Sequence, residues 1–271
     1  MPLVDRRFWV YDEPLESAAF NSAFAALAGE FAKSGAGPIG VAALIDDPAV
    51  LSSRREPVWR DTDLMFAGYL EDGRQLRIRY FRDAAIGPGL PDSPTVEESQ
   101  RRDYSLEGDH RIERLADSAD VTVDDVLALW QRENALAPEE ALRRVHEVEL
   151  VAVSGDEGVV GVSSAYLQRN ARLRMDLWYY RTFVAESHRR SNVAAQLLFG
   201  TRDVLERRFT TGEDRRAGAM IFELENIGLM RSRNKAQWLR AGFTFIGEND
   251  YGHHVRIHYF EGAEVPPPPS A

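Results

Sequence analysis

The segment Phe183–Leu198 (FVAESHRRSNVAAQLL) places two arginines in a short polar turn between a predicted strand and a predicted helix. The first amides of a helix have no acceptor within the helix, and with the helix dipole they form an anion site. Arg189 and Arg190 add positive charge, and Ala194 is small enough for a phosphate to approach the backbone. Asn192 is the best non-glycine candidate here for a left-handed conformation. The segment predicts a diphosphate site, with a solvated helix cap as the alternative.

Metal and thiol chemistry have few candidates in this sequence. The chain has no cysteine, which excludes disulfides, thiolate nucleophiles and zinc sites with cysteine ligands. His253, His254 and His258 lie close together, but on a strand His253 would oppose the other two. No recognised motif places a carboxylate beside them. We therefore expect structural or solvated histidines and no metal.

The elements around the turn follow a regular order. Hydrophobic periodicity and turn residues predict a strand at 111–115, helices at 121–130 and 138–145, strands at 147–153, 159–167 and 175–184, a helix at 192–209, a strand at 219–225, a helix at 231–241, and strands at 243–246 and 254–260. The turn thus joins the longest strand to the longest helix. The aromatic residues at 178–180 on that strand are expected to serve the core.

The first hundred residues predict a smaller α/β region. The helix expected at 17–33 carries phenylalanines and leucine at spacings of three and four, and a buried strand is expected at 38–45. Strands at 63–70 and 75–81 flank a turn and predict a hairpin. Phe8 and Trp9 would dock the N-terminus onto a core. This region could be a degenerate second half of the fold, a cover for the cleft or a dimer interface.

Composition and charge limit the function classes. The net charge of −10 argues against a nucleic-acid-binding protein, which needs a basic surface. The N-terminus has no apolar signal segment, and no stretch is long enough to span a membrane. We therefore expect a cytoplasmic protein that binds neither membranes nor nucleic acid. A loop rich in glycine, proline and charge at 87–103 predicts domains at 1–105 and 106–264, with a proline-rich tail at 265–271.

The turn and a second motif resemble the GNAT superfamily of N-acetyltransferases. Residues 184–194 are similar to its acyl-CoA signature, in which Arg/Gln-x-x-Gly-x-Gly/Ala opens a helix and a leucine pair follows, here Leu197 and Leu198. Residues 238–243 (WLRAGF) are similar to its penultimate helix, which ends in Gly-Phe. The predicted order of elements is also the family's order. The resemblance covers about residues 109–262 and implies a mixed, mostly antiparallel sheet flanked by helices, preceded here by an N-terminal α/β extension.

The resemblance also implies a cofactor and the residues that hold it. Acetyl-CoA would be the co-substrate, and its pyrophosphate would lie on the backbone amides of the turn. Strand residues Phe183 and Val184 would pair with the pantetheine amides, and the turn would be formed by Arg189, Arg190, Ser191, Asn192, Val193 and Ala194.

The sequence departs from the family pattern at three positions. Asn192 replaces a usual glycine, and Arg231 falls where asparagine is common. Trp238 falls where the family often has a tyrosine that protonates the leaving thiolate, so this catalytic acid is missing. A non-catalytic acyl-CoA-binding module is therefore the alternative to an enzyme, and an acyl donor larger than acetyl is a further one.

Acetyl transfer to an amine needs a base, a polarised thioester carbonyl and a proton for the thiolate. For the base we consider carboxylates on strands that border the expected cleft. Asp176 begins the long strand, and Glu223 shares one face of the next strand with Glu225. For the acid we consider Tyr251, between the last two strands, and Tyr166. A small-molecule or peptide amine would be the acceptor, and a homodimer is compatible with the sequence.

Overall fold

The computed structural model describes residues 7–34, 37–46, 57–87, 110–189 and 191–267, which form two sheets and their helices. Three predicted features lie partly or wholly outside the described residues: the linker from residue 88 onward, Arg190, and the last four residues of the proline-rich tail.

The N-terminal region forms a four-stranded sheet in the order β1-β2-β4-β3. Its strands are β1 (Phe8–Tyr11), β2 (Gly40–Ile45), β3 (Met65–Tyr69) and β4 (Gln75–Tyr80), with α1 (Ser17–Ser34) and α3 (Pro57–Thr62). The predicted helix, buried strand and hairpin are confirmed by α1, β2 and the pair β3–β4. Phe20 and Phe24 of α1 are buried against the outer face of the sheet. Strand β1 was not predicted. It pairs in parallel with β2 and buries Phe8, whereas Trp9 is exposed.

The remainder of the chain forms an eight-stranded sheet in the order β10-β11-β12-β9-β8-β7-β6-β5. Its elements are β5 (His110–Arg114), α5 (Val123–Arg132), α6 (Pro138–Arg144), β6 (Val148–Ser154), β7 (Gly158–Asn170), β8 (Met175–Val184), α7 (Val193–Thr211), β9 (Ala219–Leu224), α8 (Ile227–Ser232), β10 (Gln237–Trp238), β11 (Phe243–Glu248) and β12 (His254–Tyr259). Neighbouring strands are antiparallel except β8 and β9. The expected mixed, mostly antiparallel sheet flanked by helices is therefore confirmed.

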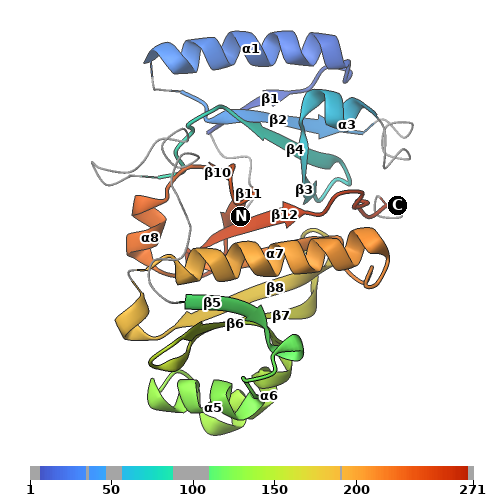
Figure 1. Ribbon diagram of the computed structural model, residues 1–271. Coiled ribbons are helices and arrows are strands. Elements are labelled where there is room, and N and C mark those ends of the chain that lie inside the picture. The colour runs from blue at the N-terminus through green and yellow to red at the C-terminus, as the bar shows by residue number, and fades with distance from the viewer. Residues whose placement is uncertain (1–6, 35–36, 47–56, 88–109, 190, 268–271) are drawn as a thin grey trace.

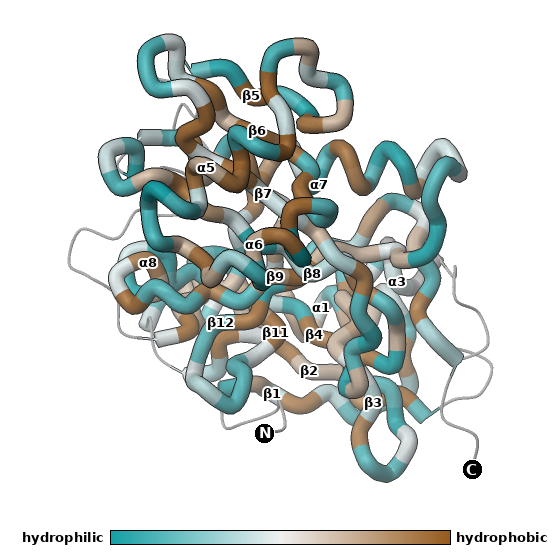
Figure 2. The backbone as a smooth tube through the Cα atoms, turned by 90° about the horizontal axis from the view of Figure 1, so that it is seen from below, coloured by the Kyte–Doolittle hydropathy of each residue, from teal (hydrophilic) through white to brown (hydrophobic). Residues whose placement is uncertain are grey.

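Each face of the large sheet has its own cover, as the alternation along β8 shows. Trp178 and Tyr180 pack in one cluster with Leu198 and Leu205 of α7. The alternate residues Met175 and Leu177 pack in another cluster with apolar residues of the N-terminal sheet. Figure 1 shows the resulting stack of α1, the N-terminal sheet, β11 and β12, and α7, with α5 and α6 beside β5 to β7. Figure 2 shows hydrophobic residues along the strands and hydrophilic ones in the outer turns. None of the described helices combines the length and apolar character that crossing a bilayer requires.

The prediction of a helix at 231–241 is wrong. A helix, α8, lies earlier, and the Asn226 side chain caps it by accepting a hydrogen bond from Leu229 N at 2.9 Å. The following residues are extended because they pair with the N-terminal region and with β11. Ala236 N donates to Ala84 O at 2.8 Å, and Phe245 N donates to Ala236 O at 2.8 Å. Contacts distant in sequence therefore replace the helix that the local pattern predicts.

Candidate functional site

The large sheet opens between its two parallel strands. Strands β8 and β9 pair only through Trp178 with Met220 and Tyr179 with Ile221. Beyond these residues β8 stays paired with β7 as far as Val184, and β9 is paired with β12 along its whole length. The facing edges therefore diverge, and the backbone groups along them are available to another partner.

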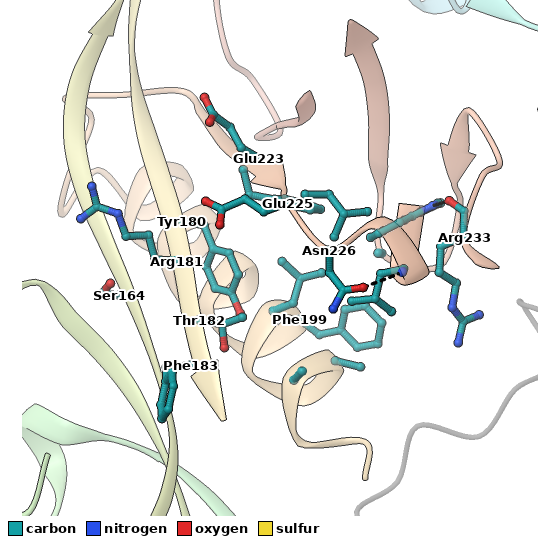
Figure 3. Close-up of a pocket in the computed structure, with 18 of the residues that line it drawn as sticks. Ser164, Tyr180, Arg181, Thr182, Phe183, Phe199, Glu223, Glu225, Asn226 and Arg233 are labelled. Atoms are coloured by element: carbon teal, nitrogen blue, oxygen red, sulfur yellow. Dashed lines mark hydrogen bonds between the residues drawn. The ribbon is translucent and has the colours of Figure 1, made fainter. Parts of the chain in front are cut away.

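A cavity of about 1050 Å³ occupies this opening. Residues of β8, β9 and α7 line it, together with residues 233–241, and Figure 3 shows the side chains that converge on it. From the α7 face it receives Tyr180, Leu198 and Phe222, and from the opposite face Tyr179 and Glu223. The cavity thus passes through the sheet, and two reactants could approach each other from opposite faces.

The N-terminus of α7 lies at this cavity. Asn192, Ala194 and Ala195 line it. Val193 N donates to Ser191 Oγ at 3.3 Å, and the Asn192 side chain forms no cap hydrogen bond with the helix. Two conditions for an anion site are therefore met, because the first-turn amides and the positive end of the dipole both face a cleft. Gly161 of β7 lets the helix approach the sheet, since a Cβ there would lie 3.0 Å from the Val193 side chain.

The turn before α7 differs in one detail from the expectation. Asn192 has φ −82° and ψ 4°, so the expected left-handed conformation at this residue is wrong. The chain turns instead through a 3₁₀ segment at Glu186–His188, which the hydrogen bond from Ser191 N to His188 O extends at 3.1 Å. A glycine is therefore not required here, which explains why asparagine is accepted.

The structure brings most of the predicted cofactor residues together. Phe183, Arg189, Ser191, Asn192 and Ala194 line the cavity. Val184 and Val193 are buried beside it, and Arg190 lies outside the described residues.

The predicted catalytic residues are dispersed. Glu223 lines the cavity and accepts a hydrogen bond from Asn249 Nδ2 at 2.7 Å. Asp176 lies at the far end of β8, where it pairs with Arg169 at 3.5 Å. Tyr251, in the turn between β11 and β12, is 84% exposed and does not line the cavity. Of these three residues, only Glu223 could reach a reactant in the cavity.

The face opposite α7 carries an aromatic and charged surface around Glu223. The rings of Tyr166 and Tyr179 lie 5.5 Å apart, and the guanidinium of Arg181 stacks 4.0 Å from the Tyr166 ring. Arg181 also pairs with Glu147 at 3.3 Å. Burial raises the pKa of Tyr179, so this phenol stays neutral near pH 7.

The wall formed by residues 233–238 was missed by the sequence analysis. Arg233, Lys235, Gln237 and Trp238 of this segment line the cavity. The Trp238 indole nitrogen donates to Arg233 O at 3.0 Å, so its proton is already committed. The buried guanidinium of Arg256 donates to Lys235 O at 2.7 Å and to Ala236 O at 3.1 Å. A charged residue within the apolar strand β12 was the available sequence signal, but it did not specify these partners.

Comparison with known proteins finds similarity in structure and none in sequence. No family model matches the chain, and no curated protein matches its sequence. Similar solved structures include a GNAT acetyltransferase from Streptococcus pneumoniae, with 10% identity and a TM-score of 0.40 over 56% of this chain and 99% of that one. A GNAT phosphinothricin acetyltransferase from Sinorhizobium meliloti, in complex with AcCoA, has 14% identity and a TM-score of 0.41 over 60% of this chain and 95% of that one.

The order of elements from β5 to β12 can now be compared with the order that the resemblance implies. From β5 to β12 the chain runs strand, two helices, three strands, helix, strand, helix and then the last strands, apart from the two-residue β10. This is the order that the resemblance in the sequence implied. This part of the chain therefore has the mixed, mostly antiparallel α/β architecture that the resemblance implied. A GNAT-family N-acetyltransferase from Escherichia coli in complex with CoA is a further similar structure, with 18% identity and a TM-score of 0.36 over 59% of this chain and 84% of that one.

Proposed function

We propose that this chain is an N-acetyltransferase that moves the acetyl group of acetyl-CoA directly to a primary amine. The observation that carries this proposal is the opening between β8 and β9 with the start of α7, at Asn192, Ala194 and Ala195, on its edge. The α7 amides and Arg189 would bind the pyrophosphate. The unpaired edge of β8 would bind the pantetheine amides, so that the thioester lies between the strands.

In the proposed reaction the amine nitrogen attacks the thioester carbonyl, the carbon–sulfur bond breaks and the thiolate takes up a proton. Glu223 is the proposed base that accepts the proton of the amine, directly or through water, because it lines the cavity on the face opposite α7. The acceptor would be a small-molecule or peptide amine that enters from this face.

A non-catalytic acyl-CoA-binding module is the second candidate. It is favoured by Trp238, which occupies the position of the family's usual tyrosine and whose indole proton is bonded to Arg233 O. This candidate predicts binding of acetyl-CoA without release of CoA thiol across a broad panel of amines. An enzyme releases thiol when a suitable amine is supplied.

The first test measures the binding of acetyl-CoA by calorimetry and by the shift in melting temperature. Asn192→Glu places a carboxylate at the start of α7 and should weaken binding at least about tenfold through repulsion of the pyrophosphate. Ser187→Glu is the matched control, because Ser187 is an exposed residue of the preceding turn that does not line the cavity. Equal binding by the parent protein and Asn192→Glu would show that the site is misplaced.

A further inference from the structure

The hydroxyl of Tyr180 is buried without a hydrogen-bond partner. Tyr180 is 7% exposed, and no hydrogen-bond partner for its hydroxyl occurs within the described residues. Other buried tyrosines are bonded, since Tyr80 donates to Phe245 O at 3.0 Å and Tyr259 to Phe66 O at 3.1 Å. A buried hydroxyl normally has a partner, and one that lacks it destabilises the fold. A hydroxyl that is retained at this cost suggests a partner that arrives with a ligand.

Tyr180 lies where the opening begins. It is the first residue of β8 after the two that pair with β9, and its ring lines the cavity. The ring packs against that of Phe222 with centroids 6.2 Å apart. From Tyr180 to Val184, beside the turn, β8 advances four residues, or about 13 Å. That distance is comparable with the extended pantetheine arm, so the reactive end of a bound acyl-CoA would lie near Tyr180.

The surroundings of Tyr180 keep its proton on the oxygen. Burial raises the pKa of Tyr180 far above its ordinary value, and the Thr182 hydroxyl beside it only partly opposes this effect. Thr182 donates its own proton to Val162 O at 3.1 Å, so it cannot donate to a ligand at the same time. The indole proton of Trp238, which also lines the cavity, is committed to Arg233 O. Tyr180 therefore keeps its proton at the start of the opening, where the Thr182 hydroxyl lies beside it but no hydrogen bond of normal geometry is formed within the described residues.

We propose that the Tyr180 hydroxyl donates a hydrogen bond to the carbonyl oxygen of a bound thioester. This inference rests on the proposed function. As the amine attacks, the carbonyl oxygen gains negative charge and the hydrogen bond becomes stronger, which stabilises the transition state. The proton stays on Tyr180 throughout. The amine gives one proton to Glu223, and the leaving thiolate takes one up from solvent, so the protons balance.

The test compares two ligands and two proteins by calorimetry. The ligands are acetyl-CoA and S-ethyl-CoA, a thioether of similar size that lacks the carbonyl. The parent protein should bind acetyl-CoA about fivefold more tightly than S-ethyl-CoA, the effect of one ordinary hydrogen bond. In Tyr180→Phe this preference should fall to about one, whereas binding of S-ethyl-CoA should not change.

Tyr179→Phe is the matched control, because the Tyr179 side chain lies on the opposite face of β8, where its hydroxyl accepts a hydrogen bond from Asn170 Nδ2 at 2.9 Å. It should keep the parent's preference for acetyl-CoA. The melting temperature of Tyr180→Phe should equal or exceed that of the parent, since the substitution removes an unpartnered buried hydroxyl, and a fall would indicate a structural role instead. A preference that persists in Tyr180→Phe overturns this inference alone. Failure of the parent to bind either ligand overturns the proposed function together with it.

Discussion

The guanidinium of Arg256 lies 4.1 Å from the ring centroid of Trp238, and Arg256 is fully buried within β12. Burial lowers the pKa of Arg256 to about 9, so it remains charged near pH 7. No carboxylate is among the hydrogen-bond acceptors described for it, which are the carbonyls of Arg233, Lys235 and Ala236. The Arg256 side chain therefore holds the cavity wall in place through the backbone carbonyls of residues 233, 235 and 236.

Arg256→Met should destabilise the fold by roughly 1–3 kcal/mol, because it removes the donor to Lys235 O and one of the two donors to each of Arg233 O and Ala236 O. It should also speed the hydrogen exchange of residues 233–238, measured by mass spectrometry. Arg216→Met is the control: Arg216 also lies over a tryptophan, 5.0 Å from the Trp178 ring, but its side chain is 64% exposed. Unchanged exchange in the wall of Arg256→Met would contradict this role.

Gly161→Val should shift the start of α7 and weaken acetyl-CoA binding. A Cβ at Gly161 would lie 3.0 Å from Val193 Cγ1 and 3.3 Å from Leu197 Cδ1, both in the first turns of the helix. We expect a stability loss of about 1–3 kcal/mol and clearly weaker binding. Gly200→Ala, where the new Cβ would lie 2.6 Å from Leu150 Cδ1 further along α7, should cost stability without weakening binding. Equal effects of both variants on affinity would refute the prediction.

Glu223→Gln should lower the rate of acetyl transfer at least about 100-fold with little change in acetyl-CoA binding, because the amide cannot accept a proton. Asp176→Asn is the control, since Asp176 pairs with Arg169 outside the cavity. Its rate should stay close to the parent's. The measurement is thiol release with an amine that the parent protein accepts. If the two variants lose activity equally, Glu223 is not the base.

His254 should make the stability depend on pH. Burial, and then the charges of Arg256 and Arg7, lower the pKa of His254 from 6.5 to about 4 in the folded protein. Between about pH 4 and pH 6.5 the unfolded chain therefore binds a proton that the native protein does not. Neutral His254 therefore makes its full contribution to the free energy of unfolding above pH 6.5. This contribution is lost as the pH falls to about 4, by roughly 3 kcal/mol in total.

His254→Phe should remove most of this dependence, because a phenyl ring can pack beside Phe245, whose centroid lies 5.3 Å from that of His254. Urea unfolding at pH 4.5, 5.5 and 7 gives the slope. Glu248 Oε1, 4.0 Å from His254 Nε2, is a nearby carboxylate and stays in place. His253→Phe should keep the parent's slope. A slope that is unchanged in His254→Phe would assign the effect to other groups.

Local patterns predicted the elements that carry their own signals. The spacing of Phe20 and Phe24 located α1, and the turn before Gln75 located the hairpin of β3 and β4. The polar turn located the start of α7, because strand, turn and helix are contiguous in the sequence. For this reason most of the cofactor residues predicted from the turn line the cavity together.

Features that depend on distant partners could not be predicted. Residues 234–236 are extended because Ala84 and Ile86 pair with them, and these partners lie about 150 positions earlier. Strand β1 is short and needs β2 beside it. Asp176 and Glu223 are carboxylates on the neighbouring strands β8 and β9. Because these strands diverge on one side of their pairing, Glu223 lines the cavity and Asp176 lies outside it.

The join between β8 and β9 has a mechanical consequence. With two residue pairs, this strand pairing alone would connect the two halves of the large sheet only weakly. The N-terminal sheet packs across both halves, because one apolar cluster contains Leu177 of β8, Ile221 of β9 and Ile78 of β4. The N-terminal sheet therefore holds β8 and β9 in a fixed relative position, although the two strands diverge along the cleft.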